Sequence, residues 1–313
     1  RGLGDVYKRQ FWYQSSQIAA RQRAQHNKKA EEKKKELQEF IARFSANVAK
    51  SKQATSRKKM IDKLKIEDIK PSSRRYPALI FEQEREAGDQ ILNIENLSYR
   101  HGDCILFSNI NLNIAKGDKL IVYSKDSRAV TAFYEVVNGK FAPEQGKVEW
   151  GVTTNHAYLP LDHDSYFEKN LLLVDWLRQF AKTEEEREEV FIRGFLGKML
   201  FSGEEALKTC NVLSGGEKVR CMLSKMMMER ANVLLFDEPT NHLDLESITG
   251  LNNALNKYKG TLICSTSDHA FSQSLGTRII ELTPKGVIDR LTSFDDYMTD
   301  TSIKDLRNKM YAS

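Results

Sequence analysis

The chain has 313 residues, 40% hydrophobic and 29% charged, a composition that supports one large folded domain or two smaller ones. It has no apolar run of the ~18 residues that a membrane-spanning helix needs and no secretion leader, so we expect a cytoplasmic protein without a membrane domain. The four cysteines lack the spacing of a metal site or a disulfide framework and are expected to be reduced.

The net charge of +5 is distributed unevenly along the chain. Residues 11–76 contain 18 lysines and arginines against 7 acidic residues, whereas the residues from 77 onward are acidic overall. A locally basic segment of this kind is typical of a surface that meets a polyanion.

The N-terminal part divides into two segments. Residues 1–10 begin without methionine and follow no periodic pattern, which indicates a non-native or fragment-edge segment. Residues 11–76 combine sparse apolar positions at helical spacing with interleaved glutamates and lysines, and small polar residues interrupt them near 45–55, so we predict a helical hairpin.

Five basic residues stand near the predicted tip of this hairpin: Lys50, Lys52, Arg57, Lys58 and Lys59. Set among Ser and Thr, they suit a phosphate backbone that is contacted without reading its sequence. A solvated charged face is the alternative interpretation of the same residues.

Prolines at 71 and 77 indicate a connector over residues 77–90, followed by an α/β domain over 91–301 and a helix or tail over 302–313. Alternating apolar residues and turn signals predict strands over 91–100, 104–115, 118–124, 147–150, 156–160, 261–264, 278–282 and 286–290. Helices are predicted over 129–137 and 245–257, near 269 and from 294, and residues 165–208 are dominated by helical patterns.

Two motifs carry the chemistry. The first is a glycine-rich turn that leads into a helical pattern, formed by Ser214, Gly215, Gly216 and Glu217. A helix N-terminus reached through glycines presents free N–H groups and a positive dipole end to a phosphate.

The second motif is an apolar run over residues 233–236 that ends in Asp237 and Glu238, as in a buried parallel strand. An aspartate at this point can hold Mg²⁺, and the following glutamate can orient and deprotonate a water that attacks a γ-phosphate.

Together these motifs resemble an ATP-binding cassette (ABC) ATPase. LSGGE at 213–217 is similar to the family signature, residues 233–238 to the Walker B strand and residues 241–244 to the D-loop. The resemblance implies a P-loop NTPase cassette with a helical subdomain before the signature, and ATP and Mg²⁺ as ligands. It also implies that Asp237 holds the metal, that Glu238 is catalytic and that the four signature residues contact ATP held by a partner cassette.

The chain departs from the family at its phosphate loop, Gly-x-x-x-x-Gly-Lys-Ser/Thr, where residues 123–131 are YSKDSRAVT. We align Ala129 with the lysine and Val130 with the Mg²⁺-binding hydroxyl, so the cradle is expected to be degenerate. The remaining candidates for this chain's own site are Ser124, Arg128, Thr131 and His101, the last falling near the adenine-stacking aromatic position. Arg128 and Thr131 are the candidates to compensate in part for the missing phosphate-binding lysine.

Two further positions differ from the family. Leu161 stands where the family places a glutamine that contacts Mg²⁺ and water, and Ser267 stands at the switch histidine. This alignment puts His269 at a neighbouring arginine position, although a contact of His269 with a γ-phosphate is a second interpretation.

A basic hairpin directly before a cassette, with DEPTNHLDLES at residues 237–247, resembles the C-terminal half of an ABC-F protein. The resemblance implies a ribosome-associated ATPase in translation, whose hairpin tip approaches ribosomal RNA and peptidyl-site tRNA. The other partner implied is the first cassette of the same protein. Because the phosphate loop is degenerate, this half alone is expected to have little or no ATPase activity.

Two other classes remain open. The ATP-binding subunit of an ABC transporter would have no basic hairpin before its cassette. A chromosome-maintenance ATPase would have a helical arm several times longer.

Overall fold

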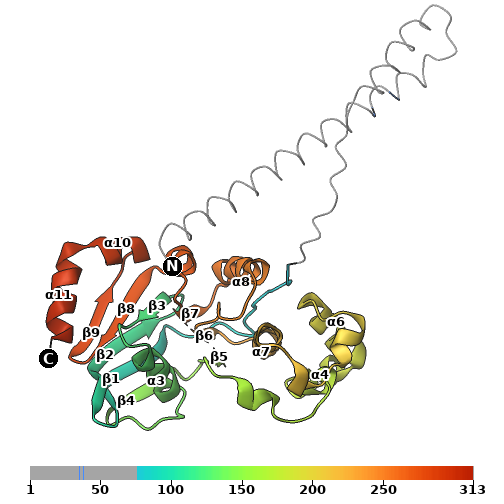
Figure 1. Cartoon of the computed structure of the whole chain (residues 1–313), viewed down its shortest axis with the longest axis horizontal. Coiled ribbons are helices and arrows are strands. Elements are labelled where there is room, and N and C mark those ends of the chain that lie inside the picture. The colour runs from blue at the N-terminus through green and yellow to red at the C-terminus, as the bar shows by residue number, and fades with distance from the viewer. Residues whose placement is uncertain (1–34, 36–37, 39–75, 313) are drawn as a thin grey trace, which may run out of the picture. The chain divides into compact units, whose positions relative to one another are not determined.

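The computed structural model describes residues 35, 38 and 76–312 of the chain (Figure 1). Lys35 and Gln38 are helical and exposed, as expected of a solvated helix. The predicted RNA-contacting residues Lys50, Lys52, Arg57, Lys58 and Lys59 lie outside the described residues. Residues 76–312 form an α/β unit built on two β-sheets.

The larger sheet has six strands in the order β5-β6-β7-β3-β8-β9, all parallel except β9, which pairs antiparallel with β8. The strands are β3 (Lys119–Tyr123), β5 (His156–Leu159), β6 (Val233–Asp237), β7 (Thr261–Ser265), β8 (Arg278–Thr283) and β9 (Gly286–Arg290). Every residue of β6 and β7 is buried, because an inner parallel strand is covered on both faces. This explains why both strands are continuous apolar runs in the sequence.

The smaller sheet is antiparallel, in the order β2-β1-β4, with β1 (Gln90–His101), β2 (Cys104–Ala115) and β4 (Gln145–Trp150). The β1–β2 turn contains Gly102, whose φ of +58° is in the left-handed region that favours glycine. Helix α3 (Ser127–Val137) follows β3, and it shares one hydrophobic core with both sheets. Members of this core include Phe107 of β2, Phe133 of α3 and Leu235 of β6.

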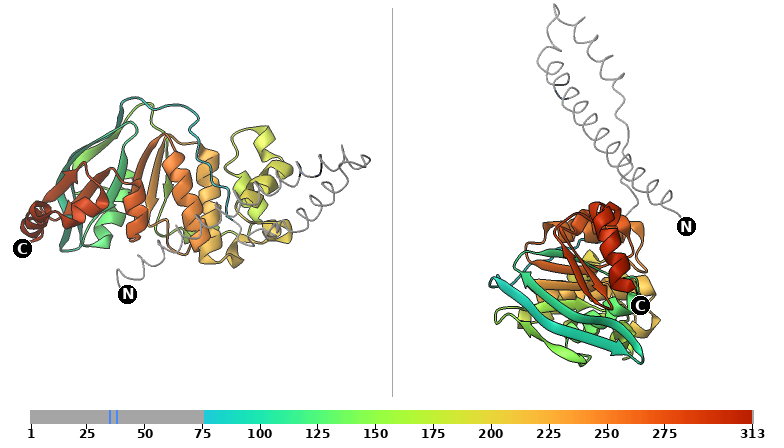
Figure 2. Two further views of the ribbon diagram at one scale, coloured as in Figure 1. Left: turned by 90° about the horizontal axis from the view of Figure 1, so that it is seen from above. Right: turned by 90° about the vertical axis from the view of Figure 1, so that its left-hand side faces the viewer.

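The remaining helices lie around the larger sheet and at the two ends of the unit (Figure 1). They are α4 (Leu173–Arg178), α5 (Glu184–Arg187), α6 (Glu189–Lys198), α7 (Gly215–Glu229), α8 (Leu245–Lys257), α9 (His269–Leu275), α10 (Phe294–Thr299) and α11 (Thr301–Tyr311). Short 3₁₀ turns occur at Asp164–Phe167, Gly203–Leu207 and Cys210–Val212. Helices α4 and α6 lie at one end of the unit, and α10 and α11 lie at the other (Figures 1 and 2).

The predicted α/β cassette with a helical segment before LSGGE is confirmed, and each predicted strand is present. The helix predicted from residue 294 is two helices, because Asp300 ends α10 and caps α11 by accepting a hydrogen bond of 2.7 Å from the Ser302 N–H. Within the described part of the chain, no helix combines the length and the apolar character needed to span a bilayer.

Candidate nucleotide site

The loop between β3 and α3 has the position of a phosphate loop, but it contains a carboxylate of the chain, that of Asp126. Asp126 is the N-cap of α3, and its carboxylate accepts a hydrogen bond of 3.0 Å from the Arg128 N–H. The Arg128 guanidinium binds the same carboxylate, with Nη2 at 2.7 Å from Oδ2, and this hydrogen bond holds the pKa of Asp126 below its usual value. A carboxylate therefore occupies the helix N-terminus where a phosphate would be favoured.

Backbone donors of this loop are already used within the chain. The Asp126 N–H donates to the Ser124 hydroxyl at 3.3 Å, and the Ala129 N–H donates to the Asp126 carbonyl at 3.0 Å. The Lys125 N–H donates to the Tyr311 hydroxyl at 3.0 Å. A phosphate needs such donors free and convergent, so the loop does not fit one in this arrangement.

The structure corrects the alignment of the loop by one residue. Thr131, rather than Val130, faces the Walker B strand: its hydroxyl donates a hydrogen bond of 2.8 Å to the Asp237 carboxylate. A phosphate-loop Ser/Thr and a Walker B aspartate meet around Mg²⁺, so Thr131 stands at the hydroxyl position and Val130, which is buried, stands at the lysine position. The interpretation of Val130 as the replaced hydroxyl residue was therefore wrong, whereas the absence of the lysine holds in either alignment.

Asp237 is 2% exposed at the end of β6. Its other oxygen accepts a hydrogen bond of 2.9 Å from the Ser265 hydroxyl on β7. Burial raises the pKa of Asp237 to about 6, and the hydrogen bonds from Thr131 and Ser265 oppose that rise. A carboxylate and a hydroxyl suited to Mg²⁺ are thus present, without a lysine beside them.

Glu238 adopts a left-handed backbone conformation, with φ of +53°, that costs roughly 1–2 kcal/mol for a residue other than glycine. Its N–H donates to the Ser265 carbonyl at 3.0 Å. One oxygen of its carboxylate accepts hydrogen bonds from both the N–H (2.9 Å) and the hydroxyl (3.0 Å) of Ser267. The residue at the expected switch position is therefore tied directly to the expected catalytic glutamate.

His269 does not share this contact. Its Nε2 lies 3.0 Å from a carboxylate oxygen of Asp295, and its ring packs edge-on against Phe294 at a centroid distance of 5.1 Å. Both of these partners lie on α10, and none of the described contacts of His269 supports a contact with a γ-phosphate.

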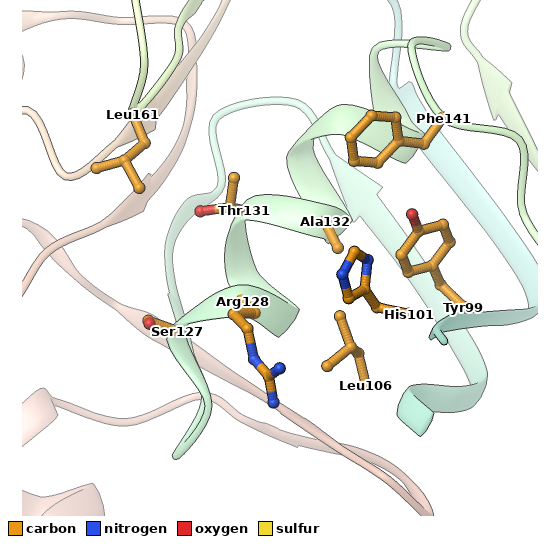
Figure 3. Close-up of a pocket in the computed structure, with 9 residues that line it drawn as sticks. All are labelled: Tyr99, His101, Leu106, Ser127, Arg128, Thr131, Ala132, Phe141 and Leu161. Carbon is orange, nitrogen blue, oxygen red and sulfur yellow. The ribbon is translucent and has the colours of Figure 1, made fainter. Parts of the chain in front are cut away.

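A pocket of about 270 Å³ opens beside α3 (Figure 3). It is lined by Tyr99, His101, Leu106, Ser127, Arg128, Thr131, Ala132, Phe141 and Leu161. Leu161 lies across the pocket from Tyr99 and Phe141 (Figure 3). Three of the four predicted own-site residues, His101, Arg128 and Thr131, line it together, and Ser124 does not.

Sequence reasoning missed the aromatic wall of this pocket. The rings of Tyr99 and Phe141 stack with centroids 5.8 Å apart, and Tyr99 also stacks on Phe107 at 6.0 Å. Tyr99 is two residues before His101 on β1, so the alternation of side chains along a strand places both on one face. This alternation could have predicted that Tyr99 lies beside His101. Phe141 comes from the segment after α3, and no local pattern indicated its position.

The signature forms the N-terminus of α7. Ser214 is the N-cap and accepts a hydrogen bond of 3.3 Å from the Glu217 N–H, while Glu217 accepts one of 2.8 Å from the Ser214 N–H, which completes a capping box. Burial opposes ionisation of Glu217, but hydrogen bonds from Lys208 and Ser214 outweigh it and lower its pKa to about 2. The Lys208 ammonium lies 2.8 Å from Glu217.

The D-loop packs closely on both signature glycines and leaves no room for a side chain at Gly216. A Cβ at Gly216 would lie 2.6 Å from the His242 carbonyl oxygen, and one at Gly215 would lie 3.2 Å from the His242 ring. Ser214 and Gly215 are exposed, so this helix end faces solvent. All four predicted signature residues therefore come together at one accessible helix N-terminus.

Comparison with known proteins agrees with this geometry. Two family models, both described as ABC transporter, match residues 8–81 and residues 107–241. The fold is similar to the dimeric structure of MJ0796, a bacterial ABC transporter cassette, with a TM-score of 0.54 and 18% identity over 64% of this chain and 98% of that one. It is also similar to an ATP-binding subunit of an ABC transporter, with a TM-score of 0.57 and 16% identity over 70% of this chain and 98% of that one.

Among curated proteins, the uncharacterized ABC transporter ATP-binding protein YkpA of Bacillus subtilis (strain 168) is 49% identical over 96% of this chain and 56% of its own length. The probable ATP-binding protein YbiT of Escherichia coli O157:H7 is 40% identical over 93% of this chain and 55% of its own length. ABC transporter F family member 5 of Arabidopsis thaliana is 30% identical over 83% of this chain and 37% of its own length. The chain spans about half the length of the first two relatives. With its cassette fold, signature helix and Walker B strand, it belongs to the ABC-F family of ATP-binding cassette proteins.

Proposed function

We propose that this cassette completes the ATP site of another cassette through its signature helix and does not hold ATP at its own phosphate loop. The observation that carries the proposal is the contrast between the two sites. The N-terminus of α7 is exposed and well formed, whereas the N-terminus of α3 is filled by Asp126 and Arg128. A phosphate approaching α3 would meet the Asp126 carboxylate at the helix N-terminus. One approaching α7 would meet the N–H groups of Gly215 and Gly216, and the Glu217 carboxylate there is paired with Lys208.

The signature side offers two kinds of donor to a phosphate. The Ser214 oxygen accepts the Glu217 N–H, so its own hydroxyl hydrogen is available for a further bond. Gly215 and Gly216 add N–H groups in the first turn of α7, where no partner within the helix exists. The partner in this proposal is the first cassette of the same protein, with ATP and Mg²⁺ held mainly by that cassette.

The chain by itself is proposed to have no appreciable ATPase activity, although the ABC family hydrolyses ATP. Glu238 is the family's catalytic residue, but here Ser267 holds its carboxylate and no lysine is present to bind a γ-phosphate near it. Asp237 and Thr131 suit Mg²⁺, yet Leu161 replaces the amide that would complete its surroundings. Glu238 and Asp237 are therefore assigned vestigial roles.

The wider activity that we propose is action on the ribosome in translation. It is supported by the charge of residues 11–76, by the family model that matches residues 8–81, and by 30% identity to an F-family member over 83% of the chain. In this proposal Lys50, Lys52, Arg57, Lys58 and Lys59 contact ribosomal RNA and peptidyl-site tRNA. The alternative is the ATP-binding subunit of an ABC transporter, which the description of the matching family favours.

Sedimentation with ribosomes tests the proposal. The whole chain is expected to cosediment with 70S ribosomes at low salt and to dissociate as salt rises, with a log–log slope of ~0.7–0.9 per phosphate contact. Replacing Lys50, Lys52, Arg57, Lys58 and Lys59 by Gln should weaken binding and flatten that slope. The matched control replaces five exposed cassette lysines by Gln: Lys257, Lys259, Lys285, Lys304 and Lys309. Equal losses in both variants, or no cosedimentation at all, would reject a specific RNA-binding tip.

A further inference from the structure

Helix α11 reaches the phosphate loop from the far end of the sequence. The Lys125 N–H donates a hydrogen bond of 3.0 Å to the Tyr311 hydroxyl, and the Tyr311 hydroxyl donates one of 2.9 Å to the Leu282 carbonyl on β8. Since its single hydrogen points to Leu282, the hydroxyl also accepts from Ser124, whose Oγ lies 3.3 Å away. One side chain of α11 thus satisfies two donors of the loop.

The contact extends beyond the hydroxyl. The Lys125 ammonium lies 4.4 Å from the centroid of the Tyr311 ring, a cation–π arrangement. Burial raises the pKa of Tyr311 to about 12, so the phenol stays protonated and keeps its donor at physiological pH. The first part of the loop, Ser124 and Lys125, is therefore held from one side by a neutral hydroxyl and an aromatic face.

A buried ion pair fixes α11 in this place. Glu281 on β8 is fully buried and accepts hydrogen bonds from Arg307 Nε at 2.8 Å and from the Tyr297 hydroxyl at 2.6 Å. The Arg307 guanidinium also lies 5.7 Å from the centroid of the Tyr123 ring, at the end of β3. An unpaired buried carboxylate is costly, so Glu281 strongly favours the position of α11 in which Arg307 is present.

We propose that α11 is an intramolecular latch that takes the place of a nucleotide at the phosphate loop, with the Tyr311 hydroxyl as its contact with the Lys125 N–H. The inference rests on the proposed function, in which this loop does not bind the phosphates of ATP. In cassettes that bind nucleotide, the ligand orders this loop through N–H bonds. Here the hydroxyl does so, and the loop stays ordered while α7 serves another site.

Amide hydrogen exchange on the full chain tests the latch, because it reports the Lys125 N–H directly. Tyr311→Phe removes the hydroxyl and keeps the ring. We expect exchange at Lys125 to become at least tenfold faster, while exchange in β6, which β7 separates from β3 in the sheet, stays within twofold of wild type.

The matched control is Tyr297→Phe, which removes another tyrosine hydroxyl from the same Glu281 cluster without touching the loop. It should leave the ratio of Lys125 exchange to β6 exchange unchanged. Unchanged exchange at Lys125 in Tyr311→Phe, or an equal increase in Tyr297→Phe, would overturn the latch.

Titration of the wild-type chain with Mg-ATP separates this inference from the proposed function. Saturable binding that protects the Lys125 N–H would overturn the proposed function and the latch together. Absence of binding, combined with unchanged exchange in Tyr311→Phe, would overturn the latch alone.

Discussion

The Thr131 hydroxyl on α3 donates a hydrogen bond of 2.8 Å to the Asp237 carboxylate at the end of β6. The two residues are 106 positions apart in the chain, and they are of the types that meet around Mg²⁺ in a phosphate-loop site. The residue before Thr131 is a buried valine, so the phosphate-binding lysine is missing beside an otherwise preserved pair. The proposed loss of nucleotide binding therefore concerns the phosphate loop rather than the contact between Thr131 and Asp237.

Rebuilding the cradle should restore nucleotide binding. The variant combines Ser124→Gly, Asp126→Asn, Ala129→Gly and Val130→Lys, which removes the internal carboxylate and adds the lysine in the corrected alignment. We expect no saturable Mg-ATP binding to wild type by calorimetry, and a gain of at least about 100-fold in affinity in the variant, since each charge-assisted hydrogen bond contributes ~1.5–3 kcal/mol.

The control for this experiment carries Val130→Met in place of Val130→Lys, which adds side-chain length without charge. It should bind far more weakly than the lysine variant. Tight binding by wild type would show that the native loop still holds phosphate.

Replacing Asp237 by Asn should stabilise the cassette at pH 7.5. Burial raises the pKa of Asp237 from 3.8 to about 6, so its charged form is disfavoured in the folded state by about 3 kcal/mol, at 1.36 kcal/mol per pKa unit. Asn keeps hydrogen-bonding partners for Thr131 and Ser265 without the charge. We expect urea denaturation to show an increase of ~1–3 kcal/mol in the free energy of unfolding.

The comparison is Asp244→Asn, since Asp244 is an exposed N-cap of α8 that Asn can replace. It should change stability by less than ~0.5 kcal/mol. A loss of stability in Asp237→Asn would mean that the buried charge is compensated by its neighbours.

Because of the capping box of α7, the free energy of unfolding should fall at low pH. The folded-state pKa of Glu217 is lowered from 4.5 to about 2, so its ionised form stabilises the fold above pH 4.5, and that contribution is lost as pH falls from about 4.5 towards 2. Glu217→Gln should lower the free energy of unfolding by ~1–3 kcal/mol at pH 7. The difference from wild type should shrink below pH 4.5 in urea titrations. A difference that is independent of pH would assign the loss to packing instead.

Replacement by alanine should have opposite effects on stability at Gly216 in α7 and at Gly194 in α6. Gly216→Ala puts a Cβ 2.6 Å from the His242 carbonyl oxygen, and we expect a loss of ~1–3 kcal/mol of stability together with displacement of the D-loop. Gly194→Ala in α6 meets no atom within 4 Å and should stabilise by ~0.5–1 kcal/mol through helix propensity. Thermal and urea denaturation of both variants check the pair, and equal effects would contradict the predicted clash.

Much of the fold was predictable because its signals are local. The sequences of β6 and β7 are continuous apolar runs, which is typical of inner parallel strands. The glycines before Glu217 predicted the start of α7. The helix or tail predicted over 302–313 nearly coincides with α11, but no end was predicted for the helix from 294, although Asp300 followed by Ser302 is a capping signal.

The candidate site likewise has one part that the sequence predicted and one part that only the tertiary structure showed. The signature residues, Asp237 and Glu238 were identified from motif spacing, and His101, Arg128 and Thr131 do meet at one pocket. The alignment of the loop was set one residue too early, because residues 123–131 have no glycine and no lysine directly before a Ser or Thr to mark the register. Only the contact of Thr131 with Asp237 decided it.

By itself the sequence determined the class of fold, the signature helix and the absence of a phosphate-binding lysine, since these depend on residue types at short spacing. The tertiary structure alone decided which side chains contact the loop between β3 and α3. The Lys125 N–H contacts the Tyr311 hydroxyl across 186 residues, and the Asp126 carboxylate is paired with the Arg128 guanidinium. The physical reason is that α11 is positioned by the buried Glu281–Arg307 pair, and such a pairing depends on how distant elements pack and leaves no periodic trace in the chain.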